Sequence, residues 1–379
     1  MPKSKSPKWL ITAITVVVIF AVLYFTMWQP KPSEEVIKIG AVYPLTGPLS
    51  IYGETEKTVT DYAIDEINRR GGVNGRKIRV IYEDGKCSGM AALTAAKKLL
   101  TVDKVKIILG GSCSSEVLSM APEAKKYGAL LFTSIASSPD ISKMGNVFRN
   151  TIITSDEGKK LADFINKNGY KRIAILTENN DYTLSIRDGL VSGLDRNKIV
   201  YDELFNFGEK DFHTYITKMK YSYPDAIFVF SVGGNGGLAV KQIREQNINS
   251  QIFGAENPGT YDFLELAGDS ANGIIYTDVP EINENNEKLR DILKYFSNKG
   301  ITPVNNYFVA ARYDSIYILV DAMKKCGEDT ECISSYIKSK EHYGLIGKYT
   351  FDKNGDMKGL EITLKKIVEG KPQLIKEQK

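Results

Sequence analysis

The stretch that decides the fold is ILGGSCSSEVLSMAPEAKKYG, residues 108–128. An apolar run ends at GGSCSS, small hydroxyl residues follow, and apolar residues then recur at helical spacing. This order predicts a strand at 105–109, a loop, and a helix at 116–127 that stops at Gly128. In an open parallel sheet, a loop of this kind lies beyond the carboxyl end of a strand, which is where ligands bind.

The GGSCSS loop also offers groups that suit an anion. A helix N-terminus has unpaired N–H groups and about half a positive charge, and Ser114 and Ser115 add hydroxyl donors. The pattern therefore favours a site for a carboxylate or a phosphate. Plain N-capping, which serine performs routinely, is the alternative.

The same alternation of strand and helix extends in both directions from this loop. In the first half, strands are expected at 36–42, 77–82, 105–109 and 130–133, and helices at 55–70, 90–100 and 116–127. The rhythm restarts after Asp156, with helices at 158–168, 183–194, 211–220 and 237–246 and strands at 172–176, 199–204, 226–232 and 251–254. Such an alternation predicts an α/β fold of two similar halves, each a parallel sheet wrapped by helices.

The last part of the chain predicts a long amphipathic helix at 307–325, followed by two strands at 348–351 and 361–367. The segment 352–356, DKNGD, is expected to join these two strands as a hairpin turn. It resembles a calcium-binding loop only superficially, because it lacks the glycine at position six and the glutamate at position twelve.

Length and charge limit the classes of function. A chain of 379 residues predicts two domains. The net charge of +4 comes from Lys3, Lys5, Lys8 and Lys31, which precede the first acid, so the body is neutral. A neutral body gives a nucleic-acid partner no electrostatic support.

Residues 9–28, WLITAITVVVIFAVLYFTMW, contain no charge and as a helix would be about 30 Å long. Lysines precede this stretch, so 1–8 is expected to be a cytoplasmic tail, 9–28 a transmembrane helix and 29–35 a linker. A cleaved signal peptide is the alternative, although no small-x-small site ends the stretch. Either way, the body is expected outside the cytoplasm, attached to the cell membrane.

The chain has four cysteines, Cys87, Cys113, Cys326 and Cys332. An even number in an exported body indicates two disulfides, and Cys326 and Cys332 enclose a short loop that is easily bridged. With two histidines and no C-x-x-C, neither a metal site nor a cofactor is expected.

Several motifs together resemble the branched-chain amino-acid binding proteins, which are type I periplasmic binding proteins that serve ABC transporters. The motifs are IGAVYPLTGP at 39–48, YG at 52–53, AIDEIN at 63–68, GGVNGRKI at 71–78 and GEKDF at 208–212. The resemblance covers about 36–367. It implies two Rossmann-like lobes joined by three crossovers, with a ligand cleft between them. The first lobe would be 36–154 plus 278–346, and the second 155–277 plus 347–379. It also implies a disulfide between Cys87 and Cys113, which would hold the GGSCSS loop.

The resemblance further implies a set of ligand-binding residues for an amino acid. Ser114 would bond the α-carboxylate, Ile135 would offer its backbone carbonyl, Ser137 would contact both polar ends, and Glu256 would pair with the ammonium. Three aromatic residues would complete the cleft around the ligand, Tyr52, Tyr182 and Phe308. These types suit a zwitterion, because each buried charge needs a partner of the opposite kind.

One departure from the leucine-binding relatives concerns selectivity. VGGNGG at 232–237 stands where a second tyrosine is expected, which removes bulk from the pocket. The sequence thus predicts an extracytoplasmic, membrane-anchored solute-binding subunit of an ABC importer for an amino acid, branched-chain or aliphatic, with a permease as its partner. A ligand-sensing ectodomain and an amide- or urea-binding protein of the same fold are the alternatives. An enzyme is not expected, because Ser114 has no G-x-S-x-G context and His213 and His342 lie in no catalytic pattern.

Overall fold

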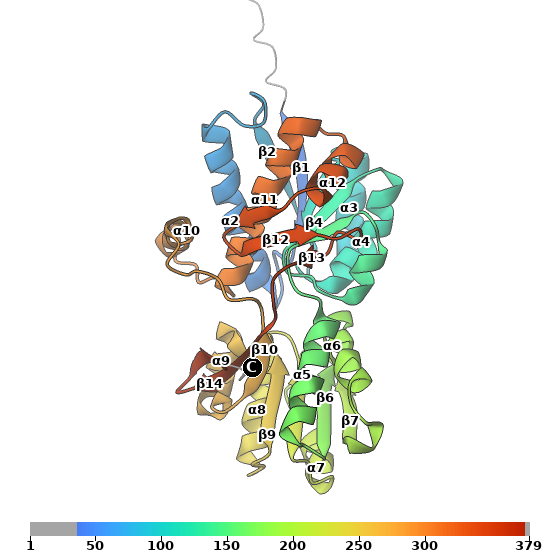
Figure 1. The fold of residues 1–379 in the computed structure, drawn as a ribbon, viewed down its shortest axis with the longest axis vertical. Helices are drawn as coiled ribbons and strands as arrows, with labels where there is room; N and C mark the ends of the chain where they lie inside the picture. Colours follow the sequence, from blue (N-terminus) through green and yellow to red (C-terminus); the bar gives the residue numbers. More distant parts are fainter. Residues whose placement is uncertain (1–35, 376–379) are drawn as a thin grey trace, which may run out of the picture.

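The computed structural model describes residues 36–375, which form two lobes along the long axis of the molecule (Figure 1). The expected membrane segment 9–28, with its tail and linker, lies outside the described residues. Within 36–375, no helix is both long and apolar enough to cross a bilayer.

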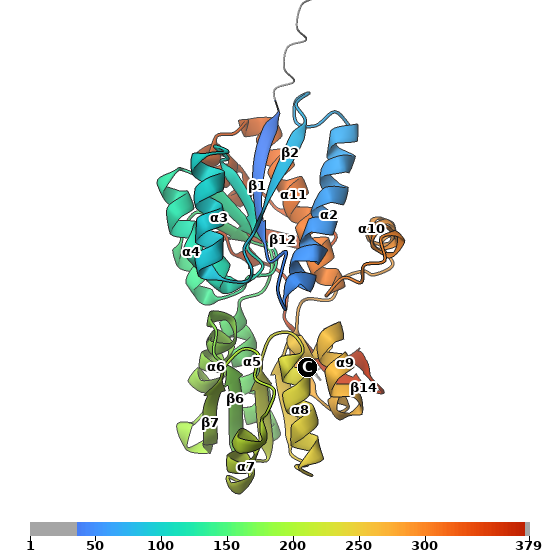
Figure 2. The ribbon, with the colours of Figure 1, turned by 180° about the vertical axis from the view of Figure 1, so that it is seen from behind.

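The first lobe is built on a five-stranded parallel sheet of order β2-β1-β3-β4-β5. Its first segment contains β1 (Ile37–Tyr43), α2 (Ser50–Arg69), β2 (Ile78–Asp84), α3 (Gly89–Thr101), β3 (Ile107–Gly110), α4 (Ser114–Lys126), β4 (Leu130–Thr133) and β5 (Val147–Arg149). A second segment adds α10 (Glu287–Asn298), α11 (Asn306–Cys326), α12 (Thr330–Lys338), β11 (His342–Gly344), β12 (Gly347–Phe351) and β13 (Met357–Lys358). Helices α3 and α4 bury their apolar sides on one face of the sheet, and α2 and α11 on the other (Figures 1 and 2).

The second lobe is built on a seven-stranded sheet of order β15-β14-β10-β9-β8-β6-β7. It contains α5 (Thr154–Asn168), β6 (Ile173–Glu178), α6 (Asp181–Ser192), β7 (Ile199–Phe205), α7 (His213–Tyr221), β8 (Ala226–Phe230), α8 (Asn235–Glu245), β9 (Gln251–Ala255), α9 (Tyr261–Ala267), β10 (Ile275–Asp278), β14 (Thr363–Val368) and β15 (Lys371–Leu374). Strands β14 and β15 are antiparallel additions to an otherwise parallel sheet. Helices α5 and α6 cover one face, and α7, α8 and α9 the other.

The chain passes between the lobes three times, after β5, after β10 and after β13. The predicted α/β fold of two Rossmann-like lobes joined by three crossovers is therefore confirmed. The fully buried Arg149, at the end of β5, holds the turn between β12 and β13 in the first lobe. Its Nε lies 2.7 Å from Oδ1 of Asp356, and its amide donates to the Gly355 carbonyl at 3.0 Å.

The predicted hairpin between 348–351 and 361–367 is wrong. The turn at 352–356 joins β12 to the short strand β13, with Phe351 opposite Met357, and β14 pairs instead with β10 of the second lobe. Tyr349, Phe351 and Met357 are buried in the core of the first lobe. Residues 347–358 therefore pack with the first lobe, whereas the sequence placed them in the second. The difference arises because apolar alternation predicts a strand but not which neighbour it pairs with.

Candidate functional site

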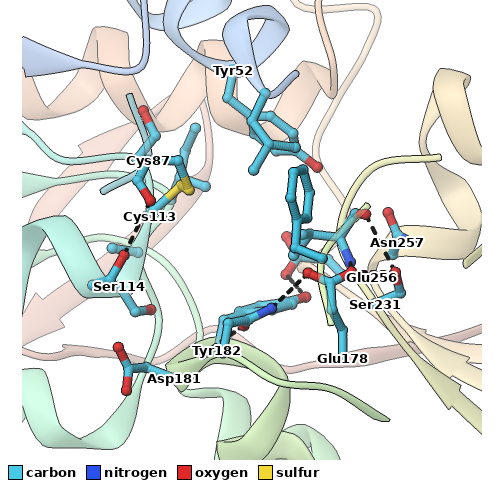
Figure 3. Close-up of a pocket in the computed structure, with 18 of the residues that line it drawn as sticks. Tyr52, Cys87, Cys113, Ser114, Glu178, Asp181, Tyr182, Ser231, Glu256 and Asn257 are labelled. Carbon is cyan, nitrogen blue, oxygen red and sulfur yellow. Dashed lines mark hydrogen bonds between the residues drawn. A yellow bond between two sulfur atoms is a disulfide. The ribbon is translucent and has the colours of Figure 1, made fainter. Parts of the chain in front are cut away.

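A cavity of about 280 Å³ lies between the lobes, at the carboxyl ends of the parallel strands. Its wall comes from both lobes, so a ligand there would contact both (Figure 3). From the first lobe it is lined by Pro48, Leu49, Tyr52, Lys86, Cys87, Ser112, Cys113, Ser114, Ser115, Ile135, Ala136, Asn305 and Phe308. From the second lobe it is lined by Glu178, Asn180, Asp181, Tyr182, Phe207, Ser231, Val232, Glu256, Asn257 and Thr260.

The GGSCSS loop runs from the end of β3 into α4 and forms part of the cavity wall. Gly110 has φ of +104°, and a Cβ there would lie 2.1 Å from the carbonyl oxygen of Val42, so only glycine fits. Helix α4 begins at Ser114, two residues before the predicted start at 116, and its first residues, Ser114 and Ser115, line the cavity. The first N–H groups of a helix have no partner within it, so they are available to an anion.

The loop is held from behind by a disulfide and a buried carboxylate. Cys87 and Cys113 are bonded, as are Cys326 and Cys332, which confirms both predicted disulfides. The two carboxylate oxygens of Glu116 accept the backbone amides of Cys87 and Cys113, each at 3.0 Å. Burial raises the pKa of Glu116 to about 7, against the lowering effect of those amides.

Ser114 is oriented as a hydrogen-bond donor to the cavity. Its Oγ accepts the backbone amides of Ser138 at 3.2 Å and Ser137 at 3.4 Å. Because these amides occupy the oxygen lone pairs, the hydroxyl proton remains for another acceptor. A ligand carboxylate placed at the start of α4 would supply one.

Glu256 faces this region from the second lobe, directly after β9 (Figure 3). Its backbone has φ of +50°, a conformation that a glutamate rarely adopts and that costs about 1–3 kcal/mol. The Tyr182 hydroxyl donates to Oε2 of Glu256 at 3.3 Å, whereas Oε1 has no hydrogen-bond partner among residues 36–375. Burial, together with the negative charge of Asp278, raises the pKa of Glu256 to about 8. A cation beside this carboxylate would stabilise its charged form.

Three aromatic rings narrow the cavity. Tyr52 comes from α2 and Phe308 from α11 of the first lobe, while Tyr182 comes from the first turn of α6 in the second. Burial raises the pKa of both tyrosines well above the usual value, so their hydroxyl groups remain neutral donors.

Six of the seven predicted ligand-binding residues line the cavity: Tyr52, Ser114, Ile135, Tyr182, Glu256 and Phe308. Ser137 does not line it. The residue is fully buried behind Ser114, and its carbonyl accepts both the amide and the hydroxyl of Thr154, each at 3.0 Å. The Ser137 carbonyl is thus engaged at the crossover into the second lobe. Its hydroxyl has no hydrogen-bond partner among residues 36–375, so its contact with a ligand stays a prediction.

The sequence analysis missed Glu178, a second acid in the wall. Glu178 is the last residue of β6, where Oε2 accepts the Ser231 hydroxyl at 2.8 Å and Oε1 accepts the Asn180 side-chain amide at 2.9 Å. Burial raises the pKa of Glu178. An acid two residues after the predicted strand at 172–176 was the available signal.

The polar groups of the cavity are divided between the lobes. The first lobe contributes serine hydroxyls, the start of α4 and Lys86, whereas the second contributes the carboxylates of Glu178, Asp181 and Glu256. In residues 36–375, no group of three or more histidine, cysteine or acidic side chains is arranged to hold a metal. The arrangement suits a small molecule with an anionic end and a cationic end.

Comparison with known proteins agrees with this geometry. The sequence matches the periplasmic binding protein family over residues 36–359. A leucine-, isoleucine-, valine-, threonine- and alanine-binding protein of Pseudomonas aeruginosa is 27% identical over 338 residues, which cover 88% of this chain and 90% of the relative.

Solved structures share the same architecture. The branched-chain amino-acid transporter substrate-binding protein of Streptococcus pneumoniae, in complex with isoleucine, is 27% identical with a TM-score of 0.80, covering 90% of this chain and all, 100%, of that one. A solute-binding protein of an ABC transporter from Rhodopseudomonas palustris, in complex with 3,4-dihydroxybenzoic acid, shares the fold at 23% identity, with a TM-score of 0.76 and coverage of 89% and 95%. These relatives are substrate-binding proteins and not enzymes. The chain belongs to the periplasmic binding protein family, among the branched-chain amino-acid substrate-binding proteins of ABC transporters.

Proposed function

We propose that this substrate-binding protein captures a branched-chain or other aliphatic amino acid between its lobes and delivers it to the permease of an ABC importer. The observation that supports this most strongly is the placement of Ser114 and Glu256. Ser114 offers a hydroxyl at a helix N-terminus in one lobe, and Glu256 offers an unpartnered carboxylate oxygen in the other. An α-amino acid has the two complementary charges.

Binding energetics favour a ligand with both charges over one with a single charge. Removing a charged group from water costs several kcal/mol unless an opposite charge or hydrogen bonds replace the water. Here Ser114 and the amides of α4 would replace water at the carboxylate, and Glu256 would replace it at the ammonium. Because the two partners sit in different lobes, the ligand would stabilise the closed arrangement of the lobes.

The remaining wall suits an apolar side chain. Leu49, Ile135, Val232 and Phe308 line the cavity, and no bulky residue follows Val232 in the glycine-rich segment 233–237, which leads into α8. Apolar walls of this kind supply affinity for aliphatic groups by burying them, at about 25 cal/mol per Å². The named ligands of the relatives, among them leucine, isoleucine and valine, have such side chains.

An aromatic acid, which the Rhodopseudomonas palustris neighbour binds, is the contrasting ligand class. Benzoic acids have a carboxylate but no cation, so they would leave Glu256 buried without a partner. The same reasoning disfavours a neutral amide or urea. The unpartnered oxygen of Glu256 therefore supports an amino acid over these classes.

The proposal includes an anchor formed by 9–28, with the binding body outside the cytoplasm. The support is the uncharged 20-residue length of this segment, about 30 Å as a helix, and the lysines before it. In the producing cells, the full chain should sediment with membranes and be released by detergent but not by high salt. Release of a shortened soluble form would favour a cleaved signal peptide.

Calorimetric titration of the full chain tests the ligand class. The panel should contain the twenty common amino acids, short amides and benzoates, with Glu256→Ala as the site variant and Glu265→Ala, an exposed acid in α9, as the control. We expect tight binding of aliphatic amino acids, lost in Glu256→Ala and kept in Glu265→Ala. Binding of benzoates or amides alone would refute the proposed class.

A further inference from the structure

Glu157, in the first turns of α5, is a buried acid that the proposed function leaves unexplained. Its side chain is 0% exposed, and neither carboxylate oxygen has a hydrogen-bond partner within the described part of the chain. An ionised carboxylate in that state would cost several kcal/mol, so some other feature must compensate.

The position of Glu157 connects it to the ligand site. Helix α5 packs on β10, and the Thr277 hydroxyl of that strand lies near enough to the Glu157 carboxyl to lower its pKa. On the neighbouring strand, the amide of Glu256 donates to the Thr277 carbonyl at 2.5 Å. Glu157 and Glu256 therefore both lie beside Thr277, and each has a carboxylate oxygen without a hydrogen-bond partner among residues 36–375.

Within residues 36–375, the charged groups that act on these two acids do not neutralise them. The titratable and charged groups around the pair, from α5, α6, β10, β14 and the first lobe, are Asp156, Tyr182, Asp278, Glu281, Lys365, Tyr52 and Tyr307. The cation among them, Lys365, is already engaged: its Nζ lies 3.0 Å from Asp278 and 2.8 Å from Glu281. A proton is the remaining means of removing one negative charge from the pair.

We propose that Glu157 is a second acid of the ammonium subsite: in the empty protein Glu157 and Glu256 share a bound proton, and the ammonium of the ligand displaces it. This inference rests on the proposed function, since it needs a cationic end on the ligand. The displaced proton leaves to solvent, and the ammonium replaces its charge next to Glu256. Glu157 does not contact the ligand in this proposal. It is a positioning residue, because it sets the proton affinity of Glu256.

Burial and the mutual repulsion of the two carboxylates agree with this exchange. Burial, followed by the charge of Glu256, raises the pKa of Glu157 well above its usual value, and the pKa of Glu256 is about 8. Two carboxylates that repel one another titrate as a pair, so replacing either should let the other ionise at lower pH. A ligand that brings no positive charge should leave this proton in place, so proton release marks the binding of a cationic group.

The first test uses the empty protein and needs no ligand. Stability of the full chain against urea, followed by far-ultraviolet circular dichroism, is measured across pH for wild type, Glu157→Gln and Glu256→Gln. An acid whose folded-state pKa is raised binds protons in the native state, so stability falls as pH rises from the usual glutamate pKa of 4.5 to about 8. We expect both variants to fall less steeply than wild type. Asp163→Asn, an exposed acid of the same helix that is not among the groups acting on the pair, should keep the wild-type slope.

The second test measures the exchange with L-leucine. Calorimetry near neutral pH, in two buffers of different ionisation enthalpy, should show release of about one proton per bound leucine in wild type and clearly less in Glu157→Gln. Below neutral pH, the affinity for leucine should fall from its value at high pH as Glu256 takes up a proton. This fall should be smaller in Glu157→Gln than in wild type, by about tenfold for each unit by which the substitution lowers the pKa of Glu256.

The outcomes separate this inference from the proposed function. Equal pH slopes for wild type and both variants would overturn the shared proton, whatever ligand binds. Unchanged proton release in Glu157→Gln would also overturn it. Failure of leucine to bind, with the slopes changed as expected, would instead count against the proposed ligand and leave the shared proton established.

Discussion

The hydroxyl of Tyr182 lies 3.3 Å from Oε2 of Glu256, and both residues line the second-lobe wall of the cavity. The tyrosine therefore orients the carboxylate from one side and leaves Oε1 for a ligand. This pair places a buried carboxyl group across the cavity from the hydrogen-bond donors at the start of α4. Binding of both ends of an amino acid depends on this arrangement.

Glu256→Gln should lower the affinity for an aliphatic amino acid by ~2–5 kcal/mol, because the buried ammonium would lose its charged partner. Glutamine keeps the size of the side chain, so stability should change little or improve above pH 8, where the wild-type acid is ionised. Calorimetry and urea unfolding on the same preparations check both parts. Retained affinity in the variant would show that the ammonium binds elsewhere.

Tyr182→Phe should cost a smaller ~0.5–1.5 kcal/mol of binding, because it removes one hydrogen bond to Glu256 and keeps the ring. The pH at which affinity is half lost should also rise, since this hydrogen bond lowers the pKa of Glu256. Calorimetry at several pH values measures both effects. Tyr261→Phe, an exposed tyrosine in α9, is the control, and an equal effect there would contradict the assignment.

Cys87→Ser should lower the free energy of unfolding by ~2–4 kcal/mol if the disulfide constrains the unfolded chain. Ligand affinity should survive largely intact, because Glu116 still holds the amides of residues 87 and 113. Adding Glu116→Gln should then reduce affinity, since the loop loses its second support. Urea unfolding and calorimetry distinguish the two effects; loss of binding in Cys87→Ser alone would assign the loop geometry to the disulfide.

Arg149→Met should destabilise the protein by ~3–5 kcal/mol, because it leaves Asp356 buried without its cation. The ion pair joins the end of β5 to the turn before β13 within the first lobe, and urea unfolding of the full chain measures the loss. Lys143→Met, which breaks the exposed pair with Asp140, should cost less than ~1 kcal/mol. Similar losses in both variants would refute the special role of the buried pair.

Much of this architecture follows from sequence pattern. The alternation around 108–128 predicts the strand, the loop and helix α4, because a buried parallel strand is apolar throughout and its helix has one apolar side. Short elements were not predictable: β5 has three residues and β13 two, too few for a period to show. The partner of β14 could not be read either, since long-range pairing leaves no local signal.

The residues of the cavity could likewise be predicted from the sequence only in part. Ser114 and Glu256 could be assigned from the matched motifs, because a loop at a strand end keeps its place in the fold. The position of Ser137 behind the cavity wall could not be read, since its neighbours in the folded chain are Ser114 and Thr154, which are far from it in sequence. Glu157 and Glu178 were missed because isolated acids in a helical or strand-end segment are most often on the surface.

The measurement that tests the central claim most directly compares leucine with two analogues that each lack one charged end. Leucic acid keeps the carboxylate and side chain without the ammonium, and isopentylamine keeps the ammonium and side chain without the carboxylate. If the two lobes hold opposite ends of a zwitterion, calorimetry on the full chain should show tight binding of leucine. Each analogue should then lose at least ~2 kcal/mol. Leucic acid binding as tightly as leucine would contradict the account, because Glu256 would then have no part in recognising the ligand.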